Sequence, residues 1–248
     1  NVLKPMGMAS SFYGAPQTPA QLKMVSTAYH MDGSEVPGKY HIYPEQAAAA
    51  LWTNPSDLAQ YIIETQLAWN GRSAKVLDQS TTKLRLTPVM ENAALGVFII
   101  KKPDGTYFSH GGANEGFRCQ YYGNVDNGNG VVVMVNSDNG AILNEIVNSV
   151  AEVYGWKEFY KQTVKKLASV PDDVLNKYAG KYLMEKDTVV ISKSGDHLAV
   201  QAPNEPMFEI FPESQTLFFI KEIPIQVEFS DGKMFVLNSG RRTEARKL

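Results

Sequence analysis

The chain has 248 residues, with 24 basic and 26 acidic side chains, a formal net charge of −2 and 44% hydrophobic residues. This ordinary globular composition fits one large domain or two smaller ones. No basic patch indicates nucleic acid binding, and no apolar stretch reaches the ~20 residues of a membrane helix. Cys119 is the only cysteine and no H-E-x-x-H is present, so we expect no disulfide, no metal site and no cofactor.

Residues 1–44 are rich in Gly, Pro, Ser and Tyr and lack strong periodicity, which predicts ordered loops with little regular structure. A helix is predicted next, because Asn54 is a favourable N-cap and Pro55 fits the first helical position. Apolar residues follow at helical spacing, and Asn70-Gly71 is a typical helix end.

The sequence then changes to a β pattern. Three β-prone runs at residues 95–100, 117–122 and 131–135 are separated by turn residues and predict a three-stranded antiparallel meander. A second helix is predicted at residues 140–154, where apolar side chains recur at helical spacing: Leu143, Ile146, Val147, Val150 and Tyr154. We expect this apolar face to pack on the meander.

Residues 157–171 are predicted to form a helical linker that ends at Pro171. Short β-prone runs separated by turn residues follow, which indicates a small barrel or sandwich. The expected fold class is therefore α+β. An antiparallel sheet with packed helices would occupy residues 1–161, a linker 162–170, and a small all-β barrel-like module 171–248.

The most informative stretch is Phe108–Arg118, which contains His110-Gly111-Gly112 and a third glycine, Gly116. Adjacent glycines on a strand edge allow a ligand to lie against the main chain, and an exposed N–H there can donate to a developing oxyanion. A glycine-rich turn between strands is the plain alternative, since glycine is a default turn residue.

This stretch resembles the third motif of the serine β-lactamase and penicillin-binding-protein-like hydrolases, a K-T-G or H-x-G triplet on the strand that lines the active site. Three further segments resemble this family in order and spacing over residues 1–156. They are Leu3–Ser11, similar to P-L-G-M-x-x-S; Leu51–Ala59, similar to L-W-S-T-x-x-D-L-A; and Val133–Asp138, similar to the last strand and turn.

The resemblance implies roles for five residues. His110, Gly111 and Gly112 would occupy the third-motif positions, the backbone N–H of Ala113 would supply half of the oxyanion hole, and Asn114 would lie near a bound carboxylate or ester. Histidine in place of lysine is common in the esterase-like and peptidase-like branches and leaves the substrate class open. A purely structural histidine at the end of a strand remains an alternative for His110.

In this family the nucleophile and its base belong to an S-x-x-K well upstream of the P-L-G-M segment, and a Y-x-N motif also precedes it. We therefore expect residues 1–161 to be the C-terminal part of a transpeptidase-like domain without its nucleophile. The all-β module resembles the lipocalin-like C-terminal appendages of the family, and its role could be substrate gating, oligomer contact or ligand binding.

A rival set of patterns is Ser80–Lys83, Ser137-Asp138-Asn139 and Lys193–Gly195, which read as S-x-x-K, S-D-N and K-[ST]-G. Their contexts argue against an active site. The first lies in a polar stretch closed by Pro88, helix N-capping explains the second, and a hairpin turn explains the third.

The full-length parent is expected to be a serine hydrolase that forms an acyl-enzyme on β-lactams, D-amino-acid peptides or small esters. The competing hypothesis is a non-catalytic relative used for binding or assembly. An incomplete sheet exposes unpaired strand edges and apolar surface, so we expect a homodimer or a retained N-terminal fragment. The resemblance also suggests an extracytoplasmic, periplasmic or secreted location.

Overall fold

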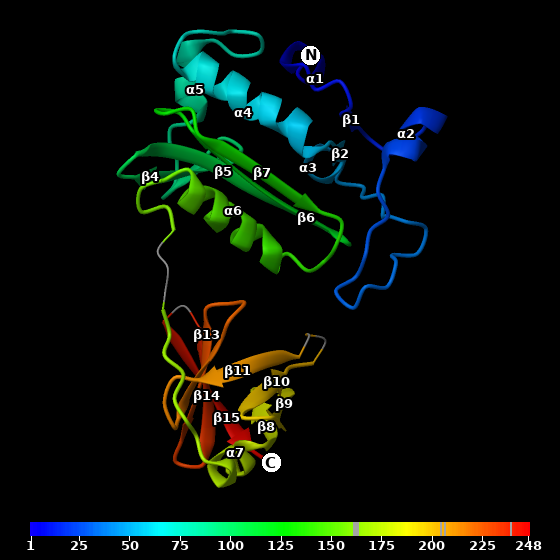
Figure 1. The fold of residues 1–248 in the computed structure, drawn as a ribbon. Helices are drawn as coiled ribbons and strands as arrows, with labels where there is room; N and C mark the ends of the chain where they lie inside the picture. Colours follow the sequence, from blue (N-terminus) through cyan, green and yellow to red (C-terminus); the bar gives the residue numbers. More distant parts are fainter. Residues whose placement is uncertain (161–163, 204, 206, 239) are drawn as a thin grey trace. The chain divides into compact units, whose positions relative to one another are not determined.

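The computed structural model describes residues 1–160, 164–203, 205, 207–238 and 240–248. The chain divides into two compact units, Asn1–Lys161 and Gln162–Leu248. The first unit contains a sheet with helices on both faces, and the second contains a closed barrel (Figure 1). The expected α+β class is confirmed. No described helix has the length and apolar character needed to cross a bilayer.

The first long helix, α4, spans Pro55–Trp69 and begins as the sequence predicts. The side chain of Asn54 accepts a hydrogen bond from the Asp57 N–H at 2.9 Å, and Pro55 occupies the first helical position. At the other end, Gly71 has a φ of +68°, a conformation that glycine adopts without strain. The predicted helix is confirmed at both ends.

The sheet of the first unit has five antiparallel strands in the order β3-β4-β5-β6-β7, not the three of the predicted meander. Their bounds are Ala93–Ala94, Val97–Lys102, Gly105–Asn114, Phe117–Asn124 and Gly130–Val135. The predicted meander lacks β3 and β5, although the histidine–glycine motif was expected on a strand edge; this motif lies on the central strand, β5. Its glycines and polar residues weaken the β pattern, although β4 and β6 satisfy its backbone along most of its length.

Helices α4 and α6 (Ala141–Val153) cover opposite faces of this sheet (Figure 1). Successive side chains of a strand point to opposite faces. Accordingly, Phe108 packs in a buried cluster with Ile62 of α4, whereas Tyr107 packs in another with Ala151 of α6. The second helix packs on the sheet as predicted, through Leu143, Val147 and Val150. The predicted apolar face is wrong for Ile146 and Tyr154, which are exposed.

Residues 1–44 are mostly irregular, as predicted, and only short elements occur between the loops up to Trp52. These elements are α1 (Leu3–Met6), β1 (Phe12–Tyr13), α2 (Pro19–Met24), α3 (Gln46–Ala49) and β2 (Leu51–Trp52). A further helix, α5 (Gln79–Arg85), lies where the sequence predicted only a polar stretch. Asp78 caps it, because its side chain accepts the N–H of Thr81 at 2.7 Å.

The second unit begins with a short helix, α7 (Asp172–Tyr178), followed by eight antiparallel strands. The strands are β8 (Gly180–Met184), β9 (Asp187–Ser194), β10 (His197–Gln201), β11 (Phe208–Pro212), β12 (Leu217–Ile220), β13 (Ile225–Ser230), β14 (Lys233–Asn238) and β15 (Arg241–Lys247). Each strand pairs with its neighbour in sequence, and β15 pairs with β8 to close the barrel. This is an up-and-down barrel.

Apolar side chains fill the barrel interior. Its buried cluster includes Phe218, Phe229 and Met234, and Leu175 of α7 belongs to the same cluster. The ring of Tyr178 stacks on Phe229 with centroids 4.1 Å apart. The interior is thus a packed core, which makes the outer surface the part of this module that can contact other molecules.

The predicted helical linker over residues 157–171 is wrong for its described part, since residues 157–160 and 164–171 are not helical. Residues 161–163, which include the start of the linker expected at 162–170, lie outside the described residues. In the second unit, the Ala168 N–H donates to the Pro212 carbonyl at 2.9 Å, and Lys165 forms an ion pair with Glu213 at 2.6 Å. Tertiary contacts therefore replace helical hydrogen bonds here.

Buried tyrosines make the stability of the fold depend on pH in the alkaline range. Burial raises the pKa of Tyr107 to about 12, and its hydroxyl donates to Asp104 at 2.7 Å. The unfolded chain ionises this tyrosine near its ordinary value of about 10. The contribution of the protonated Tyr107 to the free energy of unfolding is thus complete below pH 10 and is lost as the pH rises to 12. We expect Tyr107→Phe to flatten the fall of unfolding free energy between pH 10 and 12, measured by urea unfolding. An equally steep fall in the variant would contradict this assignment.

Candidate functional site

The histidine–glycine motif lies on the part of β5 that has a neighbour on one side only. Strand β4 pairs with β5 as far as Ser109, whereas β6 pairs with it as far as Asn114. Among the described residues, His110–Asn114 therefore has no strand partner on the β4 side. His110 and the three residues after it are solvent-exposed. Their backbone forms an open edge that can accept an extended ligand.

The alternation of an antiparallel ladder determines which backbone groups face this open edge. The carbonyl of Thr106 accepts the Val125 N–H at 3.0 Å, so Thr106 directs its polar groups toward β6. Every second residue of β5 does the same. Gly111 and Ala113 are out of phase with Thr106, so their N–H and carbonyl groups point to the open edge. Each of these two residues offers an N–H donor and a carbonyl acceptor, an arrangement that suits the backbone of a peptide-like ligand.

A tight turn at Glu115-Gly116 connects β5 to β6, and Gly116 is in close contact with a distant segment. A β-carbon on Gly116 would lie 2.4 Å from the Ala28 β-carbon and 2.8 Å from the Tyr29 nitrogen. Its φ of +71° also favours glycine. Only glycine therefore lets the segment around Ala28 lie directly on the turn.

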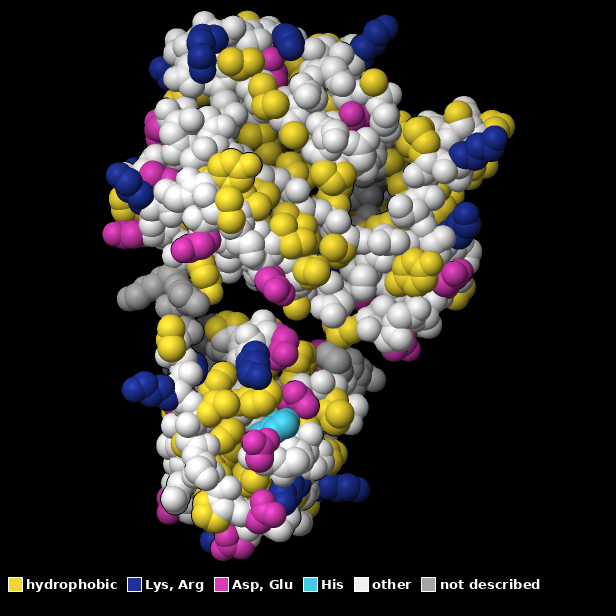
Figure 2. All heavy atoms as spheres, in the orientation of Figure 1, with side chains coloured by type: hydrophobic (Ala, Val, Ile, Leu, Met, Phe, Trp, Pro, Cys, Tyr) yellow, Lys and Arg dark blue, Asp and Glu magenta, His cyan; other side chains and the backbone are white. Residues whose placement is uncertain are grey.

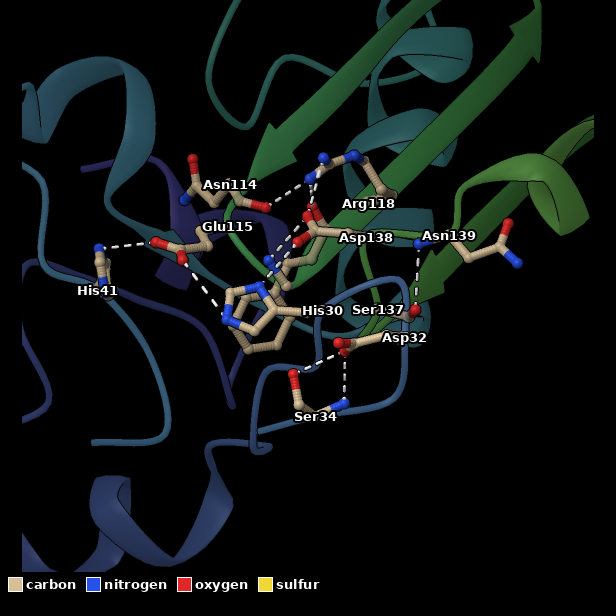
Figure 3. A network of polar contacts seen from close by, with 12 residues as sticks. His30, Asp32, Ser34, His41, Asn114, Glu115, Arg118, Ser137, Asp138 and Asn139 are labelled. Atoms are coloured by element: carbon tan, nitrogen blue, oxygen red, sulfur yellow. Dashed lines mark hydrogen bonds and ion pairs between the residues drawn. The ribbon is translucent and has the colours of Figure 1, made fainter. Parts of the chain in front are cut away.

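A polar network binds this turn to the N-terminal loops (Figure 3). His41 contacts one oxygen of the Glu115 carboxylate at 2.9 Å, and His30 lies 3.8 Å from the other. The second nitrogen of His30 lies 3.4 Å from Asp138, and Asp138 pairs with Arg118 at 2.8 Å. The network joins an N-terminal loop, the β5–β6 turn and the loop after β7 in one arrangement beside the open edge.

Backbone groups complete the network. Asp138 accepts the Gly116 N–H at 2.9 Å, and its own N–H donates to the Tyr29 carbonyl at 2.9 Å. The Glu115 N–H donates to the Tyr43 hydroxyl at 2.9 Å, and Arg118 donates to the Asn114 carbonyl at 2.6 Å. Because the turn is bound on several sides, the end of β5 has a fixed position.

The motif residues themselves have distinct surroundings. The imidazole of His110 stacks on Phe98 with ring centroids 5.7 Å apart, and its Nδ1 lies 2.5 Å from the Gly111 carbonyl oxygen. The side chain of Asn114 donates to the Ala49 carbonyl at 3.0 Å. The imidazole thus lies beside a carbonyl that faces the open edge, and Asn114 holds the end of the strand against α3.

Cys119 of β6 lies beneath the motif. A β-carbon on Gly112 would lie 2.6 Å from its sulfur, so the thiol occupies the space that a side chain at residue 112 would need. Burial raises the pKa of this thiol, which keeps it protonated at neutral pH. Its role here is to fill space below the open edge.

The rival motifs occupy ordinary structural positions. Ser80 is exposed in the first turn of α5, where its hydroxyl donates to Asp78 at 2.9 Å, and Lys83 lies over the Trp69 ring at 5.8 Å. Lys193 and Ser194 end strand β9 and Gly195 begins the predicted β9–β10 hairpin turn, because Ser194 pairs with His197. These surroundings explain both motifs without catalysis.

The capping explanation for Ser137-Asp138-Asn139 is only partly correct. Asn139 accepts the N–H of Ala141, the first residue of α6, at 3.2 Å. Asp138 instead belongs to the ion-pair network described above, because the folded loop turns it toward Arg118 rather than the helix. In the described part of the chain, no group of three or more His, Cys, Asp or Glu residues is arranged to hold a metal ion.

Sequence reasoning gave no role to His30, His41 and Glu115, and it gave Asp138 only a helix-capping role. They come from segments far apart in the chain, and no local pattern links them. One signal was present, since Glu115 directly follows the motif and precedes the glycine of the turn.

Comparison with known proteins gives consistent matches. A family model described as Beta-lactamase matches residues 1–152. Penicillin-binding protein 4* of Bacillus subtilis (strain 168) is 23% identical over 151 residues, which cover 57% of this chain and 34% of that protein. The chain thus spans about a third of this curated relative's length.

Two solved structures resemble the whole chain. A crystal structure of SurE matches with a TM-score of 0.52 at 18% identity, and the match covers 100% of this chain and 61% of the SurE chain. The octameric penicillin-binding protein homologue from Pyrococcus abyssi has a TM-score of 0.50 at 16% identity, with 99% and 58% covered. At these sequence identities, the two matches show that this chain shares their fold and show nothing further.

Proposed function

The chain belongs to the beta-lactamase family, and on this basis we propose that it supplies the substrate-binding edge and half of the oxyanion hole of a serine hydrolase. The observation that carries the proposal is the open edge of β5 at His110–Asn114. The N–H of Ala113 faces this edge and would donate to the oxyanion that develops on a substrate carbonyl oxygen. Gly111 and Gly112 leave room for the substrate to approach the backbone.

In the proposed reaction, a serine hydroxyl attacks the substrate carbonyl and forms an acyl-enzyme, while the leaving amine or alcohol receives a proton from the catalytic base. Water then hydrolyses the ester. We propose that the serine and base are contributed from outside these 248 residues, because Ser80 and Lys83 are exposed and Ser80 is engaged with Asp78. The His110 imidazole and the Asn114 amide would contact the substrate beside the edge. Candidate substrates are β-lactams, D-amino-acid peptides and small esters.

A fluorophosphonate and a reporter penicillin test this assignment, with intact-protein mass spectrometry before and after incubation. We expect the 248-residue chain to remain unlabelled, and a nucleophile-bearing segment to label where one co-purifies. An adduct on this chain would contradict the assignment, and Ser80 would be the first residue to map. If the parent gene also lacks an S-x-x-K upstream of the P-L-G-M-like segment, the competing function, non-catalytic binding or assembly, is favoured. For a catalytic parent we propose an extracytoplasmic location, which cell fractionation tests.

We also propose that the first unit associates with a second copy or with a retained N-terminal fragment. Strand β7 has a strand neighbour on one side only among the described residues. The outer face of α6 exposes Ile142, Ile146 and Val153, and hydrophobic side chains are visible at the surface over this helix (Figure 2). Light scattering combined with mass spectrometry should show a dimer or a second peptide. A monomer with no second peptide would contradict this proposal.

A further inference from the structure

A second candidate site lies at the far end of the sheet, in a pocket of about 470 Å³. This volume is within the range of small-molecule sites. One wall is the α4 face that carries Ile63, Gln66 and Leu67, and the other is the turn after β6 that carries Asp126. The open edge of β5 lies beside the start of β6, and this pocket lies beyond its end. The eight residues of β6 separate the two by ~25 Å.

Two of the amide side chains that line this pocket, Gln66 and Asn70, have oxygens with no hydrogen-bond donor among the described residues. Gln66 uses its NH₂ group to donate to the carbonyls of Asn124 and Asn129, at 3.0 and 2.8 Å. Asn70 uses its NH₂ group to donate to the carbonyls of Gln66 and Val125, at 2.9 and 3.1 Å. Because these bonds fix both amides, the side-chain oxygens of Gln66 and Asn70 remain as acceptors.

A cation is favoured at this place for two further reasons. The pocket lies at the C-terminal end of α4, where the helix dipole favours positive charge. Asp126 also lines it, and only one of its carboxylate oxygens accepts the Thr106 N–H, at 2.7 Å. A ligand ammonium group can donate three hydrogen bonds to such acceptors.

The remaining lining residues suit the other parts of a small ligand. Arg72 is exposed, and no described residue accepts a hydrogen bond from its guanidinium group, which can therefore bind a carboxylate in bidentate geometry. Ile63 is 45% exposed and lies beside Leu67 on the same wall. These two side chains offer an apolar surface without further charge.

We propose that this pocket binds a free, zwitterionic α-amino acid with an aliphatic side chain. Its ammonium group binds Asp126 and the amide oxygens of α4, its carboxylate binds Arg72, and its side chain lies on Ile63 and Leu67. The site is separate from the open edge of β5 and does not depend on the presence of a nucleophile.

Leucine, N-acetylleucine and leucinamide are the probes for calorimetric titration and amide NMR shifts of the full chain. Leucine should bind and shift the amides of Gly71 and Gly128, and each analogue should bind about tenfold more weakly, because it lacks one charged group. In Arg72→Gln, leucine should bind no more tightly than leucinamide but should still bind more tightly than N-acetylleucine. In Asp126→Asn, leucine should bind no more tightly than N-acetylleucine but should still bind more tightly than leucinamide. Asparagine at residue 126 keeps an oxygen for the Thr106 N–H.

Lys23→Gln and Asp173→Asn, which change exposed charges outside the pocket, are the matched controls and should leave binding unchanged. The proposal is wrong if leucine neither binds nor shifts these amides at tens of millimolar. It is also wrong if both pocket variants weaken all three probes equally, since the charged groups would then have no specific partners.

Discussion

Replacing Gly116 with alanine is expected to destabilise the first unit by about 3 kcal/mol or more. The left-handed backbone costs a residue with a β-carbon roughly 1–2 kcal/mol, and steric overlap in a packed site adds about 1–3 kcal/mol. The overlap is with the Ala28 β-carbon and the Tyr29 nitrogen, and a backbone neighbour cannot rotate away. The segment around Ala28 should therefore separate from the β5–β6 turn.

Gly128→Ala is the matched control for this variant. Its φ of +82° imposes the same backbone cost, but nothing lies within 4 Å of the added carbon. We expect it to lose only this backbone cost, roughly 1–2 kcal/mol. All three tryptophans, Trp52, Trp69 and Trp156, belong to the first unit, so their fluorescence during urea unfolding reports on that unit alone. Equal losses in the two variants would show that the contact with Ala28 contributes nothing.

Replacing Gly112 with alanine should disturb the open edge itself, and a second change should repair it. The added carbon would lie 2.6 Å from the Cys119 sulfur, so we expect a loss of about 1–3 kcal/mol from overpacking. Cys119→Ala removes the sulfur, and the double variant should regain most of that loss. Hydrogen exchange of the β5 and β6 amides should show the same order of effects as urea unfolding.

The two single variants and the double variant form a thermodynamic cycle whose coupling term isolates the contact. Cys119→Ala alone serves as the control, because it leaves space below Gly112 without changing the strand. If the losses of the single variants simply add, the thiol does not set the size limit at residue 112.

Local signals in the sequence were sufficient for the two long helices. At α4, Asn54 and Pro55 determine the beginning through an N-cap bond, and that bond forms within a few residues. At α6, the apolar stripe includes Leu143 and Val147, which are buried. Both signals operate over one or two turns of chain, so no knowledge of the remaining fold was needed.

The glycine-containing strand could not be predicted in the same way. Gly111 and Gly112 contribute no β preference, and β5 is a strand because β6 satisfies its backbone along that stretch. The family resemblance identified the importance of the motif, but its open edge depends on where β4 ends. The residue at which β4 ends depends on the pairing between strands and is not determined by the motif.

The polar network shows a further limit. Asp138 follows a strand and precedes a helix, which is the usual position of a capping residue. Its partners His30 and Gly116 come from other parts of the chain, and only the folded structure brings them together. Three separate segments must therefore be in place before the site beside β5 is complete.

The closure of the barrel has a consequence for its synthesis. Strand β8 is the first of the eight strands to leave the ribosome and β15 is the last, yet they are neighbours in the finished barrel. During translation one edge of β8 therefore remains unpaired until the whole module has emerged. In that interval the nascent chain offers a template to other nascent strands, and a translational pause before β15 would prolong its exposure to chaperones or to aggregation.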